Sequence, residues 1–195
     1  MDSTATTTRP FKPLSAGKFQ DPDITADGKT RARVPLTGLK TLWINTGTLC
    51  NIACTNCYIE SSPRNDRLVY FTAKDARALY DEIAALSYPT TEIAFTGGEP
   101  FLNPDMPEMA GEALSRGFSV LVLTNAMTPM QRPAIRDGLL ELHRRFGDKL
   151  TMRVSLDHYT QALHEKERGA GTWASAIAGL DWLAKNGFSL AIASR

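Results

Sequence analysis

Two hydrophobic patterns alternate along most of this chain. One is a short run of apolar and β-branched residues, which is typical of a strand covered on both faces. The other places apolar residues at three- and four-residue spacing, which is typical of an amphipathic helix. The first pattern predicts strands at residues 39–45, 92–96, 118–124, 150–156 and 188–193.

The second pattern predicts four helices between these strands. Thr72 and Asp75 form a capping box that opens the first helix, which stops before Pro89. The second and third are predicted at residues 107–116 and 133–146, each followed by a glycine. We expect Thr172 to cap the fourth helix, which Asn186-Gly187 ends.

Strands that alternate with helices predict right-handed βαβ units and a parallel sheet. The alternation stops when the fifth strand ends, which would leave a parallel edge without cover. We therefore expect an α/β fold, a parallel partial TIM-type (β/α)6 barrel truncated after the fifth strand. Either the chain is a fragment of a longer protein, or a partner covers the open edge.

Composition changes this picture little. Residues 1–36 show no sustained apolar period, so we expect a flexible amino-terminal arm followed by an incomplete core domain at residues 37–195. A formal charge of +1 gives no reason to expect nucleic acid or a membrane surface as a partner. The sequence shows no membrane-spanning run and no signal-peptide layout, which predicts a reducing, cytoplasmic location where thiols stay free.

The three cysteines follow the first predicted strand. Cys50, Cys54 and Cys57 have the spacing C-x3-C-x2-C and are all the cysteine in the chain. A disulfide framework favours an even count, and a closed zinc site needs a fourth ligand. Three thiolates suit an iron–sulfur cluster whose last coordination position is left to a small molecule. A zinc site completed by a distant histidine is the alternative, and the candidates are His143, His158 and His164.

Polar motifs also follow the later strands. TGGEP (96–100) follows the second strand, TNA (124–126) follows the third, and SLD (155–157) closes the fourth. In parallel α/β folds the functional residues gather at the carboxyl ends of the strands. We therefore expect these motifs and the cysteine loop to line one rim.

Together, the cysteine loop and the Gly-Gly-Glu-Pro turn resemble the radical S-adenosylmethionine (SAM) superfamily from about Leu39 to Arg195. Within it, CNIACTNCY, TGGEP, TNA and SLDHYTQALHEKERG are most similar to the branch of peptide-modifying maturases and heme-d1-type synthases. The resemblance implies a [4Fe–4S] cluster on the three cysteines, with SAM on the fourth iron. It also implies an external electron donor, such as flavodoxin or ferredoxin.

The implied reaction is reductive cleavage of SAM to a 5′-deoxyadenosyl radical, which takes a hydrogen atom from the substrate. The substrate is not identified by the sequence, and a peptide or a cofactor precursor is the candidate class. The alternative function is a non-catalytic, metal- or cluster-binding scaffold that acts with a partner chain.

The resemblance also implies which residues surround SAM. Glycines allow close approach to its methionyl end, Glu99 adds a carboxylate, and Arg168 faces the SAM carboxylate. Ser155 and Asp157 lie two apart on a strand and face one way, as ribose ligands would. Where many relatives carry an aromatic residue before the third cysteine, this chain has an asparagine. The candidate SAM-binding residues are Gly97, Gly98, Glu99, Pro100, Asn125, Ser155, Asp157, Arg168 and, for the adenine, Tyr58.

Overall fold

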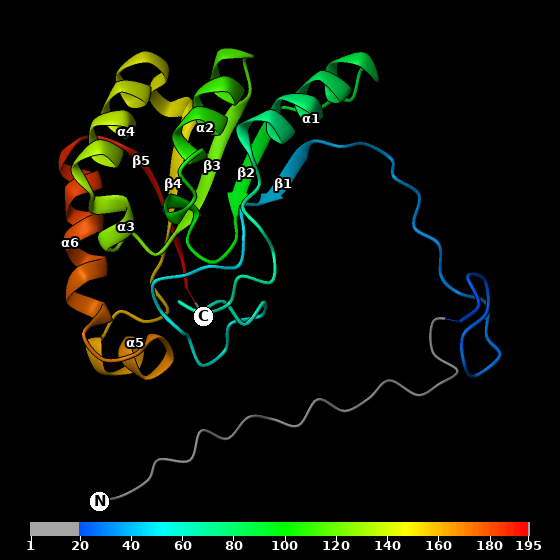
Figure 1. Cartoon of the computed structure of the whole chain (residues 1–195), viewed down its shortest axis with the longest axis horizontal. Coiled ribbons are helices and arrows are strands. Elements are labelled where there is room, and N and C mark those ends of the chain that lie inside the picture. The colour runs from blue at the N-terminus through cyan, green and yellow to red at the C-terminus, as the bar shows by residue number, and fades with distance from the viewer. Residues whose placement is uncertain (1–19, 195) are drawn as a thin grey trace, which may run out of the picture. The chain divides into compact units, whose positions relative to one another are not determined.

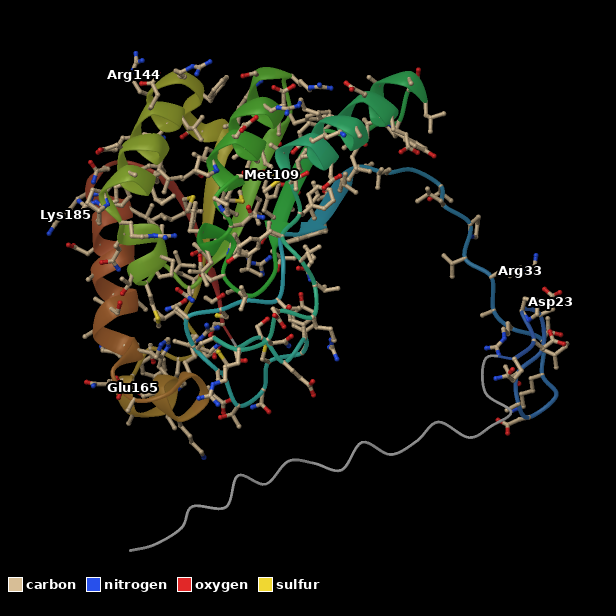
Figure 2. The ribbon with its side chains drawn as sticks, in the orientation of Figure 1. Asp23, Arg33, Met109, Arg144, Glu165 and Lys185 are labelled. Atoms are coloured by element: carbon tan, nitrogen blue, oxygen red, sulfur yellow. The ribbon has the colours of Figure 1, made fainter. Side chains whose placement is uncertain are left out.

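The computed structural model describes residues 20–194, and the chain divides into two compact units between Thr37 and Gly38. In the first unit, Ile24 and Thr30 form an antiparallel bridge. An ion pair between Asp23 and Arg33 joins the same segment (Figure 2). Residues 1–19, most of the expected flexible arm, lie outside the described residues, and the expected domain boundaries stay a prediction.

The second unit is built on five parallel strands (Figure 1). The order in the sheet is the order in the sequence, so every neighbouring pair is joined by a crossover, as the alternating pattern predicts. The α/β class and the parallel sheet are therefore confirmed. The strands are β1 (Thr41–Asn45), β2 (Glu92–Thr96), β3 (Ser119–Thr124), β4 (Leu150–Ser155) and β5 (Ser189–Ala193).

Most of the helices lie along one face of this sheet. In Figure 1, α1, α2, α4 and α6 run beside the strands, whereas α5 lies near the loop that follows β1, at the carboxyl end of the sheet. The α-helices are α1 (Ala73–Ala85), α2 (Met106–Ser115), α3 (Thr128–Gln131), α4 (Pro133–Phe146), α5 (Gln161–Arg168) and α6 (Thr172–Lys185). Two 3-10 turns, Pro100–Leu102 and Gly147–Lys149, complete the described elements. None of the described helices is long and apolar enough to cross a membrane.

The hydrophobic core lies between the helices and one face of the sheet. Phe95, Val122 and Met152 of the strands belong to this core and are almost fully buried, as is Met109 of α2, which Figure 2 labels. The opposite face of β3 and β4 is only half-buried, and Trp43 of β1 is 47% exposed. The expectation of strands buried on both faces holds for β2, whose three central residues are all fully buried, but it is wrong for the other four strands, because the described helices cover only one face.

The predicted helices all form, with one difference at a cap. Thr72 and Asp75 make the expected capping box at α1. At α6 the N-cap is Gly171 rather than Thr172, because the Thr172 hydroxyl donates to the Gly169 carbonyl, 2.7 Å away, instead of accepting from the helix. The short helices α3 and α5 were not predicted, and α5 contributes directly to the candidate site.

Candidate active site

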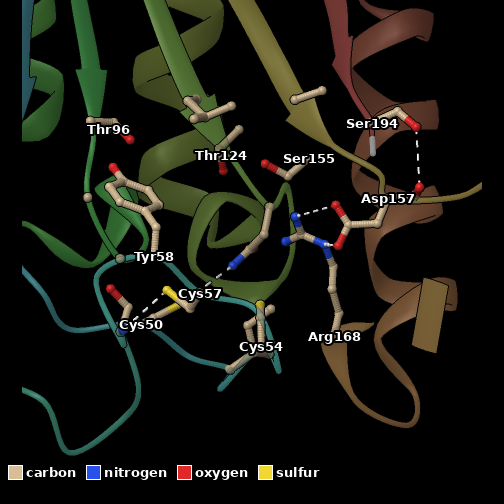
Figure 3. Close-up of a pocket in the computed structure, with 17 residues that line it drawn as sticks. Cys50, Cys54, Cys57, Tyr58, Thr96, Thr124, Ser155, Asp157, Arg168 and Ser194 are labelled. Carbon is tan, nitrogen blue, oxygen red and sulfur yellow. Dashed lines mark hydrogen bonds and ion pairs between the residues drawn. The ribbon is translucent and has the colours of Figure 1, made fainter. Parts of the chain in front are cut away.

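A pocket of about 250 Å³ opens at the carboxyl ends of the strands (Figure 3). Its walls come from the loop after β1, the turn after β2, the ends of β3, β4 and β5, and α5. The predicted site residues that line it are Cys50, Cys54, Cys57, Tyr58, Gly97, Gly98, Asn125, Ser155, Asp157 and Arg168. The structure thus brings together residues separated by more than a hundred positions in the sequence.

Hydrogen bonds hold the cysteine loop at one wall of this pocket. The Cys50 backbone amide donates to the Ser62 carbonyl at 3.1 Å, and the Cys57 amide donates to the Cys54 carbonyl at 3.3 Å. Two further donors approach the sulfur atoms. The Asn125 side-chain nitrogen lies 3.9 Å from Cys50 Sγ, and the Ser61 amide lies 3.2 Å from Cys57 Sγ. The loop therefore presents three cysteine thiols on a hydrogen-bonded backbone.

The three thiols suit a multi-iron cluster. In a [4Fe–4S] cluster each cysteine binds a separate iron, so the thiols need not converge on one point. Among the described residues, no three cysteine, histidine, aspartate or glutamate side chains converge as a single metal ion requires. Burial raises the pKa of the Cys50 thiol to about 12, against a backbone hydrogen bond from Ile52 that lowers it. Bound iron would offset the effect of burial on the Cys50 pKa, because a metal cation favours the thiolate.

Helix α5 supports the same loop from the other side. The Thr55 amide donates to the Glu167 carbonyl at 2.8 Å, and the Asn56 side chain donates to the Glu167 carboxylate. A charged run such as HEKERG (164–169) usually forms a solvent-exposed surface. Instead, α5 buries His164 completely and carries Arg168, whose side chain is 11% exposed. A Gly169 C-cap and basic residues in the last turn are the sequence signals that could have located this helix.

The glycine turn packs directly on the start of the cysteine loop. The Gly98 amide donates to the Gly47 carbonyl at 2.9 Å, and the Glu99 amide donates to the Leu49 carbonyl at 3.0 Å. A Cβ atom at Gly98 would lie 2.1 Å from the Leu49 carbonyl oxygen, and one at Gly97 would lie 2.7 Å from the Gly47 carbonyl oxygen. The two glycines are therefore required for contact between two backbones, apart from any contact with SAM.

Glu99 and Pro100 are buried and do not line the pocket. The Glu99 carboxylate accepts from Thr124 Oγ1 at 2.8 Å and from the Asn125 amide at 2.9 Å, and Pro100 opens the 3-10 turn. Burial raises the pKa of Glu99, while the hydrogen bonds from Asn125, Thr124 and Phe101 lower it. In this structure Glu99 fastens the turn after β2 to the end of β3, and its contact with SAM stays a prediction.

Asp157 and Arg168 form an ion pair at the pocket wall (Figure 3). Arg168 Nε and Nη2 donate to the two carboxylate oxygens at 3.0 and 3.2 Å, and both side chains are nearly buried. Ser155 lines the same pocket at the end of β4. Asp157 therefore holds one donor edge of the Arg168 guanidinium in a fixed orientation.

Tyr58 lines the pocket but is 76% exposed, so its ring is available at the rim. The Asn56 side chain is directed to Glu167 of α5. Asn125 lines the pocket beside Cys50, and its side chain also donates to Asn51 Oδ1 at 2.9 Å. These positions are compatible with the expected adenine contact of Tyr58, which stays a prediction together with the other SAM contacts.

His164, which the sequence offered only as a possible zinc ligand, is a further buried group. It is fully buried on α5, it meets Trp173 edge-on at 5.4 Å, and neither ring nitrogen has a hydrogen-bond partner among the described residues. Burial, followed by the positive charge of Arg168, lowers the pKa of His164. Burial therefore favours the neutral imidazole over the charged form in the folded protein.

Acid should destabilise the protein through His164. The unfolded chain takes up a proton near the ordinary histidine pKa of about 6.5, whereas the folded chain resists it to lower pH. Stability should thus be full above about pH 6.5 and fall by up to about 1.4 kcal/mol per pH unit below it. Urea unfolding at pH 7.5 and 5.5 measures this difference. In His164→Phe, the free energy of unfolding should differ less between the two pH values than in the wild type. The control His158→Gln changes the other histidine near the pocket and should keep the wild-type difference. An unchanged difference in His164→Phe would contradict the prediction.

Comparison with known proteins places this geometry in a family. A family model described as the Radical SAM superfamily matches residues 44–193 of the chain. The chain belongs to the radical SAM superfamily. The resemblance carried by the cysteine loop and the glycine turn is therefore confirmed. Membership implies a [4Fe–4S] cluster and SAM as cofactors, and the pocket that holds the three cysteines has the donor set for that cluster.

The relatives include both enzyme types expected from the motifs. The antilisterial bacteriocin subtilosin biosynthesis protein AlbA of Bacillus subtilis is 30% identical over 145 residues, which are 74% of this chain and 30% of AlbA. The AdoMet-dependent heme synthase of Methanosarcina barkeri is 28% identical over 147 residues, which are 73% of this chain and 38% of the synthase. This radical SAM chain thus spans about a third of the length of these curated relatives.

A solved structure supports the fold. The structure of Streptococcus suis SuiB bound to S-adenosylmethionine matches with a TM-score of 0.63 and 19% sequence identity, over 78% of this chain and 33% of SuiB. At this identity the similarity establishes the fold alone, and it confirms the partial TIM-type barrel expected for a radical SAM core.

Proposed function

We propose that this chain is the SAM- and cluster-binding core of a radical enzyme of the oxidoreductase or maturase type. The observation that carries the proposal is the shared pocket, where three cysteines lie with the Gly-Gly turn and a buried Asp–Arg pair. When bound, the cluster and SAM supply one-electron reductive cleavage of SAM and a radical that removes a hydrogen atom from the substrate.

The chain's own residues would bind and orient these cofactors. Cys50, Cys54 and Cys57 would each hold one iron of the cluster and would leave the fourth iron for SAM. Arg168 would bind the SAM carboxylate through its guanidinium, which the ion pair with Asp157 holds in position. The other SAM contacts that we propose, over the ribose, the methionyl backbone and the adenine, come from Ser155, Gly97, Gly98, Glu99, Pro100, Asn125 and Tyr58. The side chains that line the pocket would limit the access of water to the reacting atoms.

A peptide is the substrate class that we propose first, with a cofactor precursor second. AlbA is named for the biosynthesis of a bacteriocin, and one SuiB structure is described as bound to the precursor peptide SuiA. We also propose an external electron donor of the flavodoxin or ferredoxin type, because the described residues offer cysteines for one cluster only. A reducing, cytoplasmic setting would keep these thiols free.

The first experiment is anaerobic iron–sulfur reconstitution of the chain, followed by electron paramagnetic resonance (EPR) of the reduced protein with and without SAM. We expect a [4Fe–4S]+ signal that changes when SAM is added, because SAM would bind the open iron. Cleavage of SAM in the presence of a reductant is the second readout. A colourless protein that binds zinc and ignores SAM would contradict the proposal and favour the scaffold function.

A further inference from the structure

A buried hydroxyl without a partner lies in the wall of the cysteine pocket. Ser61 lines this pocket and is 5% exposed, and its Oγ has no hydrogen-bond partner among the described residues. A buried hydroxyl that makes no hydrogen bond is unfavourable, and such groups in native proteins usually meet a ligand or an ordered water. The position of Ser61 indicates which ligand this is.

The backbone fixes Ser61 between two of the cysteines. Its amide donates to Cys57 Sγ at 3.2 Å, which directs the residue to the sulfur of that thiol. The next residue, Ser62, forms a parallel bridge with Leu49 and accepts from the Cys50 amide at 3.1 Å. Ser61 therefore cannot move away from the cysteine loop without breaking contacts on both sides.

We propose that the Ser61 hydroxyl donates a hydrogen bond to a sulfur of the bound [4Fe–4S] cluster and thereby raises the reduction potential of the cluster. The inference rests on the function proposed above. Cluster sulfur becomes more negative on reduction, so a hydrogen-bond donor stabilises the reduced state more than the oxidised state. The Ser61 amide and hydroxyl together would supply two hydrogen-bond donors on the Cys57 side of the cluster. In this role Ser61 adjusts the reduction potential of the cluster and is not a catalytic residue.

The test is a potentiometric EPR titration of the reconstituted full chain, first without SAM. Ser61→Ala should keep the wild-type iron content and shift the midpoint to more negative potential. At a fixed potential the ratio of reduced to oxidised cluster should fall about tenfold, which corresponds to about 59 mV for a one-electron couple. Ser61→Thr, which retains the hydroxyl, should stay near the wild-type midpoint.

Ser62→Ala is the matched control. It removes the same group one residue later, where the Ser62 hydroxyl accepts from the Arg64 amide at 3.3 Å instead of facing the pocket, and the midpoint should not change. If Ser61→Ala does not retain its iron, Ser61→Gly is the second variant without the hydroxyl. Its midpoint potential is then compared with that of the wild type in the same way. A threonine variant that shifts as far as the alanine variant overturns the proposal.

Affinity for SAM separates the cluster from the SAM carboxylate, which is the other group in the pocket that could accept from the Ser61 hydroxyl. If Ser61→Ala leaves the midpoint unchanged but weakens SAM binding, the hydroxyl serves the SAM carboxylate and the proposal is wrong. If both stay unchanged, Ser61 is only structural and the proposal is also wrong. A wild-type chain that assembles no [4Fe–4S] cluster would instead overturn the proposed function itself, so the two failures are distinguishable.

Discussion

Replacing Cys54 with alanine should reduce the iron bound after reconstitution to less than a tenth of the wild-type amount and abolish SAM cleavage. Each cysteine would bind a separate iron, so two remaining thiolates cannot hold the cluster in place. No fourth cysteine exists in the chain to replace the lost ligand. Iron and sulfide analysis, together with EPR of the reduced protein, measures the loss.

The control for this variant is Thr55→Ala. Thr55 is the next residue in the loop, and its side chain reaches the Lys166 carbonyl at 3.4 Å, at the junction with α5. It therefore tests whether a small disturbance of the loop, without loss of a ligand, is sufficient to lose the cluster. We expect nearly full iron content in Thr55→Ala. Wild-type iron and SAM cleavage in Cys54→Ala would show that the assignment of the metal site is wrong.

The sheet and most of the helices could be predicted because their signals are local. Strand β2 has the predicted bounds, and the capping box of Thr72 and Asp75 is a pattern within four residues. The cysteine spacing and the glycine turn are also local, and their place after strands was enough to bring them to one rim. Each of these features is contained in a few neighbouring residues.

Features that depend on distant contacts could not be predicted. Helix α5 is short and mostly polar, and it is stabilised by contacts of Glu167 with the cysteine loop and of Arg168 with Asp157. Propensity alone does not stabilise so short a helix in water. The buried hydroxyl of Ser61 and the buried ring of His164 likewise depend on what folds over them. The open face of the sheet, which exposes Trp43, has no signal in the apolar runs themselves.

Gly98 shows that a residue in a local motif can be required by a contact with a segment far away in the sequence. The sequence suggested that the glycines allow SAM to approach the turn, but Gly98 also meets the backbone at Leu49, directly before the first cysteine. The glycine turn thus lines the expected SAM pocket and also contacts the backbone of the cysteine loop. Substitution at Gly98 should therefore affect the cluster as well as SAM.

We expect Gly98→Ala to lower both stability and cluster content. The new Cβ would lie 2.1 Å from the Leu49 carbonyl oxygen, so this backbone would have to move by about 1 Å, and the hydrogen bond from Glu99 would weaken. A cost of about 3 kcal/mol corresponds to a melting temperature about 6–12 °C lower for a chain of this size. Iron content should fall several-fold, because the displaced residue directly precedes Cys50.

Gly138→Ala is the matched control for this substitution. Gly138 lies inside α4, and a Cβ there would meet only Pro107, at an ordinary distance of 3.9 Å. Alanine favours the helix interior over glycine by up to about 1 kcal/mol, so this variant should melt at or above the wild-type temperature with full iron content. Should Gly98→Ala instead keep its iron and lose only SAM affinity, the glycine would serve SAM alone, and the backbone contact with Leu49 would not position the cysteine loop.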